Sequence, residues 1–222
     1  MQSFRKLIAI ALMAGTLSGL VWFGLQYVAV IPLIQTAEKY EAAASHPDED
    51  HATTLGRNSI TALTTVLTGI GFAAVLLGVA ALRGVRLDVR SGALWGLAGF
   101  ACVTAAPSIG LPPQPPGAAV ADLASRQMWW FGTVLATGIG FYVLATSRRR
   151  PLRILAGVGC LLLPHFIGAP VALEASVVPS TLARQFAIAS ITTTAVFWLT
   201  LGIVGGFLSG RRLRPAVTPV AP

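Results

Sequence analysis

The stretch HPDEDH, residues 46–51, places two imidazoles around three consecutive carboxylates in an otherwise strongly apolar chain. Imidazole and carboxylate together suit borderline divalent ions such as cobalt, nickel or zinc, whereas carboxylates alone suit magnesium or calcium. Pro47 disfavours a helix, so the stretch could wrap around an ion. The alternative is a hydrated acidic loop that only raises the local concentration of cations. The candidate ligands are His46, Asp48, Glu49, Asp50 and His51.

Four further polar or sulfur-containing side chains lie within apolar runs. His165 is a candidate ligand or gate, because an ionisable residue inside a membrane helix marks a functional site by default; a packing histidine is the alternative. Gln26 could face the same site or form a hydrogen bond between helices. Cys102 and Cys160 are expected to be buried, inert thiols.

The sequence offers no group of residues that would support enzymatic catalysis in a membrane. The long apolar runs contain no Asp or Glu, and no paired carboxylates or Ser–His–Asp arrangement can be assigned. The nucleotide-binding motif G-x-x-x-x-G-K-[ST] does not occur either. We therefore expect neither an enzyme nor an ATPase.

The composition places these residues in an integral membrane protein. The chain has 222 residues, of which 55% are hydrophobic and 11% charged, whereas soluble domains devote about a quarter of their residues to charge. Several apolar runs reach about 20 residues, the length that crosses a bilayer core as a helix. We predict an all-α integral membrane protein that forms a single membrane domain over residues 1–222. The expected membrane spans are about 7–34, 59–82, 91–111, 127–146, 152–171 and 186–208, with an outer acidic loop at 35–58.

Lys and Arg are distributed unevenly among the segments between these six spans. With the N-terminus in the cytoplasm, twelve fall on the inner side and four on the outer side, while seven of the eight acidic residues fall on the outer side. This distribution obeys the positive-inside rule and predicts that both termini are cytoplasmic. The net charge of +8 then reflects topology, so we expect contact with anionic lipid and no nucleic-acid partner.

Three related phrases precede the even-numbered spans: TTLGRNSIT (53–61), ADLASRQMWW (121–130) and STLARQFAI (180–188). Each places a Leu shortly before an Arg, which is followed by Asn or Gln. The pattern predicts three helical hairpins of related design, as in transporters built from internal repeats. Coincidence is the alternative, because Arg is common at helix borders.

The odd-numbered spans each carry a proline towards the expected outer end: Pro32, Pro107 and Pro164. A proline within a helix frees carbonyl groups about one turn earlier, and in a membrane such groups need protein or a watery cavity to satisfy them. The three prolines therefore predict a polar outer vestibule suited to a cation, with three ordinary kinks as the alternative.

Small residues recur at four-residue spacing in the first, third and sixth spans. The pairs are Gly15–Gly19 and Gly92–Gly96, and the series is Gly202–Gly206–Gly210. This spacing predicts close helix packing.

Five phrases together resemble the CbtA family, a family of predicted cobalt transporter subunits of prokaryotes. They are LQYVAVIPLIQTAEKYE (25–41), LGRNSITALTTVLTGIGFAAVLL (55–77), GLPPQPPGAAVADLASRQMWW (110–130), PHFIGAP (164–170) and VPSTLARQFAIASITTTAVFWL (178–199). The resemblance runs in order over nearly the whole chain. It implies a multi-pass protein of the prokaryotic cytoplasmic (inner) membrane that imports cobalt for cobalamin synthesis, together with a small one-helix, His-rich CbtB-like subunit.

The resemblance also implies site residues. The acidic motif of the family falls on Glu38 and Glu41, its Pro–His pair on Pro164 and His165, and its Asp–Arg–Gln element on Asp122, Arg126 and Gln127. Many members have a long His-rich first outer loop, whereas this chain has two histidines there. Glu38, Glu41 and His165 are therefore the stronger candidates, and residues 46–51 are expected to concentrate ions.

The sequence thus predicts a permease subunit for a divalent transition metal, with Co²⁺ favoured as the transported ion and no permanently bound cofactor. Membrane potential or a partner would drive uptake. A non-conducting accessory or scaffold subunit and a small-molecule permease are the alternatives, and a homo-oligomer stays open.

Overall fold

The computed structural model describes residues 2–44, 54–146 and 150–212, which form helices and connecting loops without a β-strand. The chain divides into two compact units. Unit 1 comprises Met1–Gly24, Ala52–Leu97 and Val196–Pro222, and unit 2 comprises Leu25–His51 and Ala98–Ala195. The expectation of a single membrane domain stays a prediction.

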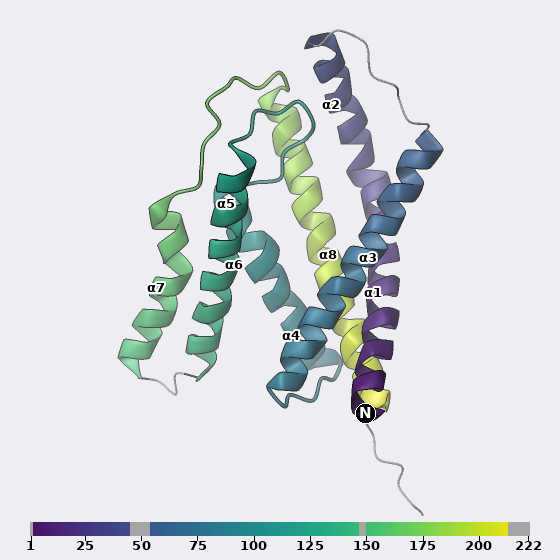
Figure 1. The fold of residues 1–222 in the computed structure, drawn as a ribbon, viewed down its shortest axis with the longest axis vertical. Coiled ribbons are helices and arrows are strands. Elements are labelled where there is room, and N and C mark those ends of the chain that lie inside the picture. Colours follow the sequence, from purple (N-terminus) through teal and green to yellow (C-terminus); the bar gives the residue numbers. More distant parts are fainter. Residues whose placement is uncertain (1, 45–53, 147–149, 213–222) are drawn as a thin grey trace, which may run out of the picture. The chain divides into compact units, whose positions relative to one another are not determined.

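Figure 1 shows the helices along the chain and labels all of them except η1. They are α1 (Gln2–Ala29), α2 (Ile31–Ala44), α3 (Thr54–Leu82), α4 (Val89–Phe100), the π-helix η1 (Ala101–Ala105), α5 (Ala106–Gly110), α6 (Leu123–Thr146), α7 (Pro151–Ile167) and α8 (Ser180–Arg212).

Within the described residues, five helical stretches are long and apolar enough to cross a membrane. They are Phe4–Ala29, Gly56–Leu82, Val89–Gly110, Leu123–Thr146 and Ser180–Arg211. The remaining expected span, 152–171, corresponds to α7, which is apolar but has 17 residues. That length is at the lower limit for a transmembrane helix, so the total of six spans and the side on which each terminus lies stay predictions.

The first expected span is divided in the structure. Helix α1 ends at Ala29, and α2 begins at Ile31 with Pro32 as its second residue, where a proline sacrifices no helical hydrogen bond. The prediction that residues 35–44 belong to a loop was wrong, because α2 continues to Ala44. This segment is rich in Ala and Glu, which favour helix even where hydropathy falls.

The even-numbered spans begin four to six residues earlier than hydropathy indicated, at Thr54, Leu123 and Ser180. The three related phrases therefore contain the first turns of α3, α6 and α8. Polar residues ended the apolar runs there, but Leu, Arg, Gln and Ala are good helix formers. Arg57, Arg126 and Arg184 consequently take matching places in the first two turns of their helices.

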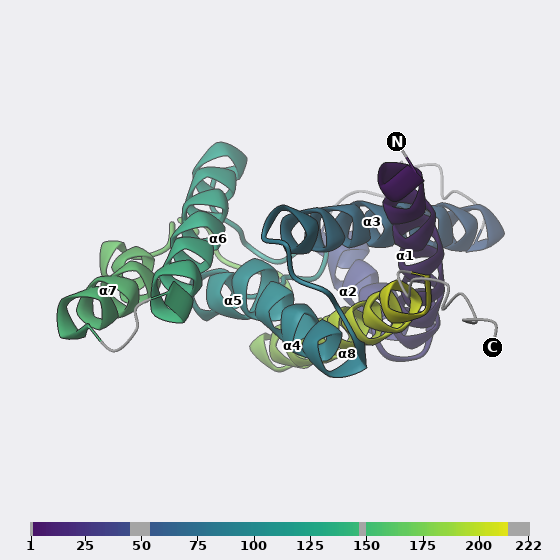
Figure 2. The same cartoon turned by 90° about the horizontal axis from the view of Figure 1, so that it is seen from below.

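Close backbone packing holds unit 1 together. A Cβ atom on Gly19 would lie 2.8 Å from Val66 Cα in α3, and a Cβ on Gly202 would lie 2.9 Å from the carbonyl carbon of Gly92 in α4. The glycine spacing thus correctly predicted close helix approach. Figure 2 shows α1 crossing α3. The aromatic rings of Trp22 and Phe197 stack beside them, with centroids 4.6 Å apart.

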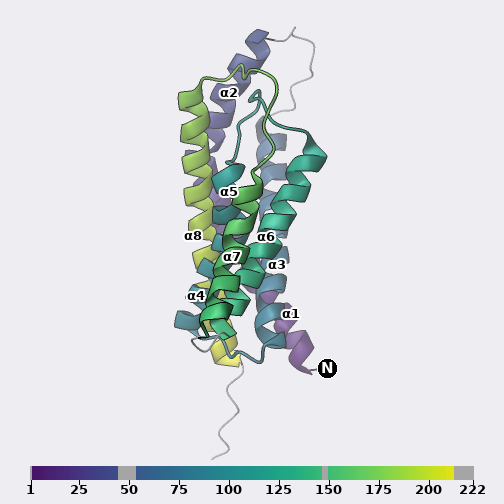
Figure 3. The ribbon, with the colours of Figure 1, turned by 90° about the vertical axis from the view of Figure 1, so that its left-hand side faces the viewer.

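Unit 2 contains the pair α6 and α7, which lie side by side (Figure 2). Their backbones meet at glycines, since a Cβ on Gly140 would lie 2.9 Å from Gly157 O. In the same unit, α2 runs beside the first half of α8 (Figure 3). A small apolar cluster of Ala37, Val178 and Leu182 joins these segments.

Candidate functional site

Asp122 sets the start of α6. Its Oδ2 accepts hydrogen bonds from the backbone N–H of Ser125 at 2.9 Å and from the Ser125 hydroxyl at 3.0 Å, which is the geometry of an N-cap. These two bonds favour the ionised form and hold the pKa of Asp122 below its usual value. A matching pair, Asp88 and Ser91, caps α4. The role of Asp122 shown by these contacts is to begin the helix that carries Arg126 and Gln127.

We expect Asp122→Ala to lower the apparent melting temperature at neutral pH, because the Ser125 N–H loses its acceptor. Asp122→Asn keeps an acceptor but cannot ionise. Since the folded pKa is depressed, the stabilisation by the carboxylate is complete above the unfolded pKa of about 3.9 and is lost as pH falls through the lower folded pKa. Thermal melting of the purified protein between pH 6 and pH 2 checks this.

The control for the pH series is wild-type protein, in which both Asp88 and Asp122 titrate. Wild type should lose more stability below pH 4 than Asp122→Asn does. Identical acid dependence of the two proteins would contradict the capping role of the ionised carboxylate.

A π-helical turn precedes the proline of the third span. In η1 the backbone N–H of Ala106 donates to Ala101 O, five residues earlier, and Pro107 follows as the second residue of α5. Pro107 has no N–H to give to the carbonyl four residues earlier. The π-turn accommodates this break without ending the helix, and such turns are frequent at functional sites.

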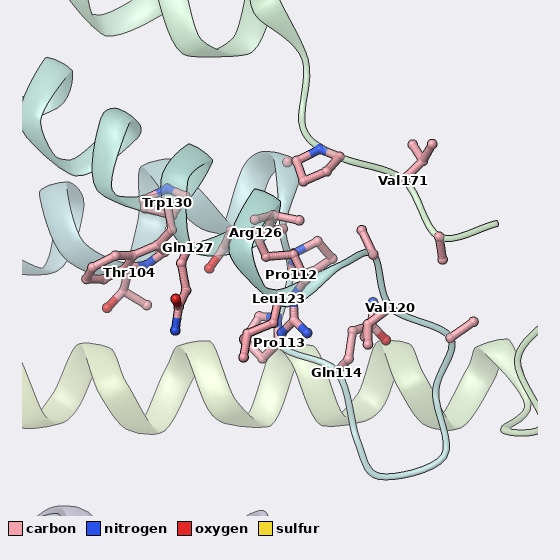
Figure 4. A pocket seen from close by; sticks show the side chains of 18 of the residues that line it. Thr104, Pro112, Pro113, Gln114, Val120, Leu123, Arg126, Gln127, Trp130 and Val171 are labelled. Carbon is pink, nitrogen blue, oxygen red and sulfur yellow. The ribbon is translucent and has the colours of Figure 1, made fainter. Parts of the chain in front are cut away.

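A pocket of about 500 Å³ lies beside this break, entirely within unit 2 (Figure 4). Its walls come from η1 and α5, from the proline-rich loop of residues 111–122, from the first turns of α6 and from residues 170–172. The volume is in the range of small-molecule sites. Pro107, Arg126 and Gln127 are the residues predicted for the site that this pocket brings together.

The pocket has apolar walls with a few polar groups. Leu111, Pro112 and Trp130 are among the apolar lining residues, and the amides of Gln114 and Gln127 and the hydroxyls of Thr104 and Ser108 also line it. Among the described lining residues, Arg126 is the one ionisable side chain. The field inside this pocket therefore favours negative charge.

Pro164 and His165 lie outside this pocket, against Trp129. The indole Nε1 of Trp129 donates to Pro164 O at 3.3 Å, and its ring meets the half-buried His165 imidazole edge-on, with centroids 6.0 Å apart. The carbonyl of Pro164 also accepts from Gly168 N at 3.1 Å. The Pro164 carbonyl is thus satisfied by protein. Helix α7 ends three residues later, at Ile167, and is followed by Gly168, whose positive φ of 86° favours glycine.

The remaining predicted residues of unit 2 are separate from the pocket. Glu38 and Glu41 lie on α2, half-buried and exposed respectively, and Glu41 Cβ lies near Gly117 of the proline-rich loop. Half-buried Gln26 lies near the end of α1, where its carbonyl accepts from Val30 N, and Pro32 is exposed. His46, Asp48, Glu49, Asp50 and His51 lie outside the described residues.

The described parts of the chain bring no three side chains of His, Cys, Asp or Glu together. Two features of unit 2 were missed by sequence reasoning. Trp129 was quoted within a phrase but given no role, and the π-helix has no distinctive composition. The proline at 107 after a long apolar run was the available signal for the helix break.

Comparison with known proteins supports the resemblance seen in the sequence. No curated protein and no solved structure matches the chain. The family model CbtA, described as a probable cobalt transporter subunit, matches residues 4–210. The apolar helices agree with a multi-pass membrane protein of this kind. Because the match covers nearly all of the sequence, the chain belongs to the CbtA family of probable cobalt transporter subunits.

Proposed function

We propose that this protein is a membrane permease subunit for the uptake of a divalent transition metal, with Co²⁺ as the preferred transported ion. Membership of a family of probable cobalt transporter subunits carries the proposal. In the part of the chain that the structure describes, five apolar helical stretches long enough to cross a membrane support it. The proposed location is the cytoplasmic membrane of a prokaryote, with both termini inside.

In this proposal, acidic and imidazole groups on the outer side collect the ion before it enters the helices. Glu38 and Glu41 lie on one helix, three residues apart, so they share a face. His165 serves as a ligand or gate near the end of α7. A divalent cation entering a negative interior gains about 4.6 kcal/mol per 100 mV. Membrane potential is therefore a sufficient source of energy.

We expect His165→Ala and the double variant Glu38→Gln, Glu41→Gln each to reduce Co²⁺ uptake about tenfold or more, as losses around metal sites commonly do. The measurement is ⁵⁷Co²⁺ uptake by cells that lack the native gene and its neighbours and express the variant with its partner genes. Membrane abundance of each variant is determined in parallel.

Glu174→Gln is the matched control, because Glu174 is an exposed acid that is expected on the same side of the membrane. It should retain wild-type uptake. Wild-type uptake by both the histidine and the glutamate variants would refute these site assignments. Unchanged uptake after deletion of the gene and its neighbours would refute the transport function itself.

A second candidate function is a non-conducting accessory subunit that assembles around a partner. The word subunit in the family's description agrees with this candidate as well as with the permease. The partner proposed is a small His-rich protein with one helix, similar to CbtB. Vesicles separate the two functions: metal flux with this chain alone supports the permease, whereas flux only after addition of the partner supports the accessory role.

A further inference from the structure

Arg126 places a positive charge at the wall of the pocket of about 500 Å³. Within the described residues, Arg126 forms a hydrogen bond through its backbone N–H, to Asp122 O at 3.0 Å, and none through its guanidinium. The side chain is half-buried. The Asp122 carboxylate does not neutralise the Arg126 guanidinium, because it accepts the hydrogen bonds of Ser125 as the cap of α6.

A free metal cation would be repelled by this guanidinium, and the repulsion would be twice as large for a divalent ion as for a monovalent one. An anion would gain from it. The planar, fork-shaped guanidinium pairs with the two oxygens of a carboxylate in bidentate geometry. The positive charge of Arg126 therefore favours a carboxylate ligand over a free metal cation.

The other walls favour an organic ligand over a small inorganic anion. Trp130 and Pro112 offer apolar surface, while Gln114 and Gln127 offer amides that can donate to further oxygens (Figure 4). A pocket of this volume holds several carbon atoms besides the anionic group. An inorganic anion would leave the apolar surface without a partner.

We propose that this pocket binds a small organic carboxylate, with the carboxylate on Arg126 and the remainder of the molecule against Trp130 and the proline-rich loop. The carboxylate can belong to a free organic acid or to an organic acid that chelates a metal ion. The pocket does not include Glu38, Glu41 or His165, the residues proposed to handle the metal, and its occupation by the free acid does not depend on cobalt transport.

Isothermal titration calorimetry on the full chain in nanodiscs of neutral lipid tests the proposal. The probes are citrate, Co²⁺ alone, the Co²⁺–citrate complex and sulfate. We expect citrate or its Co²⁺ complex to bind, and sulfate to bind at least about tenfold more weakly. Tighter binding of citrate alone identifies the free acid as the ligand, and tighter binding of the complex identifies the chelate.

Arg126→Gln should weaken this binding about 10- to 100-fold, the loss expected for one charge-assisted hydrogen-bonded pair. Arg126→Lys keeps the positive charge but lacks the two parallel N–H donors of the guanidinium. Its affinity for the ligand should therefore lie between those of wild type and Arg126→Gln. Arg184→Gln is the matched control, because Arg184 takes the corresponding place at the start of α8 but is exposed and outside the pocket. It should bind as wild type does.

Ala121→Trp provides a test that leaves the charges unchanged. Ala121 lines the pocket, so a tryptophan there should fill it and prevent binding even if Arg126→Gln fails to fold. The proposal is overturned if neither citrate nor its complex binds to wild type. It is also overturned if sulfate binds as well as they do, or if Arg126→Gln and Ala121→Trp bind like wild type. Metal uptake, measured separately, reports on the transport function.

Discussion

Replacing Gly202 with leucine is expected to prevent the stable packing of α4 against α8 in unit 1. A Cβ atom at this position would overlap the carbonyl oxygen of Gly92, and it would lie 2.9 Å from the carbonyl carbon of Gly92 and 3.0 Å from Gly96 Cα. All three are backbone atoms, so no side-chain rotation can relieve the clash. The helices would have to separate, and the packing along their length would be lost with them.

The expected cost is about 3 kcal/mol or more, at the upper end of the range for overpacked sites. Native proteins are stable by only about 5–15 kcal/mol, so this one substitution would remove a large part of the total. We expect Gly202→Leu to accumulate poorly in membranes and to lose its monodisperse peak in fluorescence-detected size-exclusion chromatography after mild heating.

Gly71→Leu is the control for adding the same side chain to a helix of the same unit. A Cβ on Gly71 would meet nothing within 4 Å, and the residue is exposed. This variant should behave like wild type. Equal thermal stability of Gly202→Leu and Gly71→Leu would show that the close approach of α4 and α8 does not hold unit 1 together.

The glycine spacing shows how far the sequence alone leads on packing. Gly92–Gly96 and Gly202–Gly206 were predicted to allow close approach because they leave a strip of bare backbone on one helix face. That strip faces its equivalent in the structure. The pairing of α4 with α8 could not be predicted, because every glycine-bearing helix presents similar bare backbone, and only the three-dimensional path of the chain brings two of them together.

The prediction of helix boundaries from the sequence is limited for a different reason. Hydropathy indicates where a helix enters lipid, not where its hydrogen bonding begins, so residues such as Arg126 were assigned to a loop although α6 starts at Leu123. The same misplacement hid the pocket. Arg126, Gln127 and Trp130 recur on one side of the first turns of α6, a pattern that is visible only once those residues are known to be helical.

Trp129 carries the second large effect, because it joins α5, α6 and the end of α7 within unit 2. A Cβ on Gly110 would lie 2.8 Å from both Trp129 Cζ2 and Ala169 Cβ, so the indole fills the space that the glycine leaves. The indole Nε1–H donates a hydrogen bond to Pro164 O, and the ring meets the His165 imidazole edge-on. The indole thus supports the position of the proposed metal ligand.

We expect Trp129→Ala to cost about 3 kcal/mol, at the lower end for removal of a large aromatic side chain because the residue is half-buried. Trp129→Phe keeps most of the ring but not the N–H, so it should cost about 1 kcal/mol, the value of one hydrogen bond. Thermal melting in detergent measures both. Met128→Ala is the control, because Met128 is adjacent in sequence but 69% exposed.

The same variants separate a structural role of Trp129 from support of His165. Trp129→Phe should fold, but the hydrogen bond from the indole to Pro164 O near the end of α7 is lost. We therefore expect His165 to move from the position that Trp129 supports. If His165 handles the ion, Co²⁺ uptake per folded molecule should fall in Trp129→Phe, and adding His165→Ala to it should cause little further loss, because the two changes act on one step. If the losses of the two single variants instead multiply in the double variant, Trp129 and His165 act independently. Wild-type uptake by Trp129→Phe would show that uptake does not depend on the indole N–H.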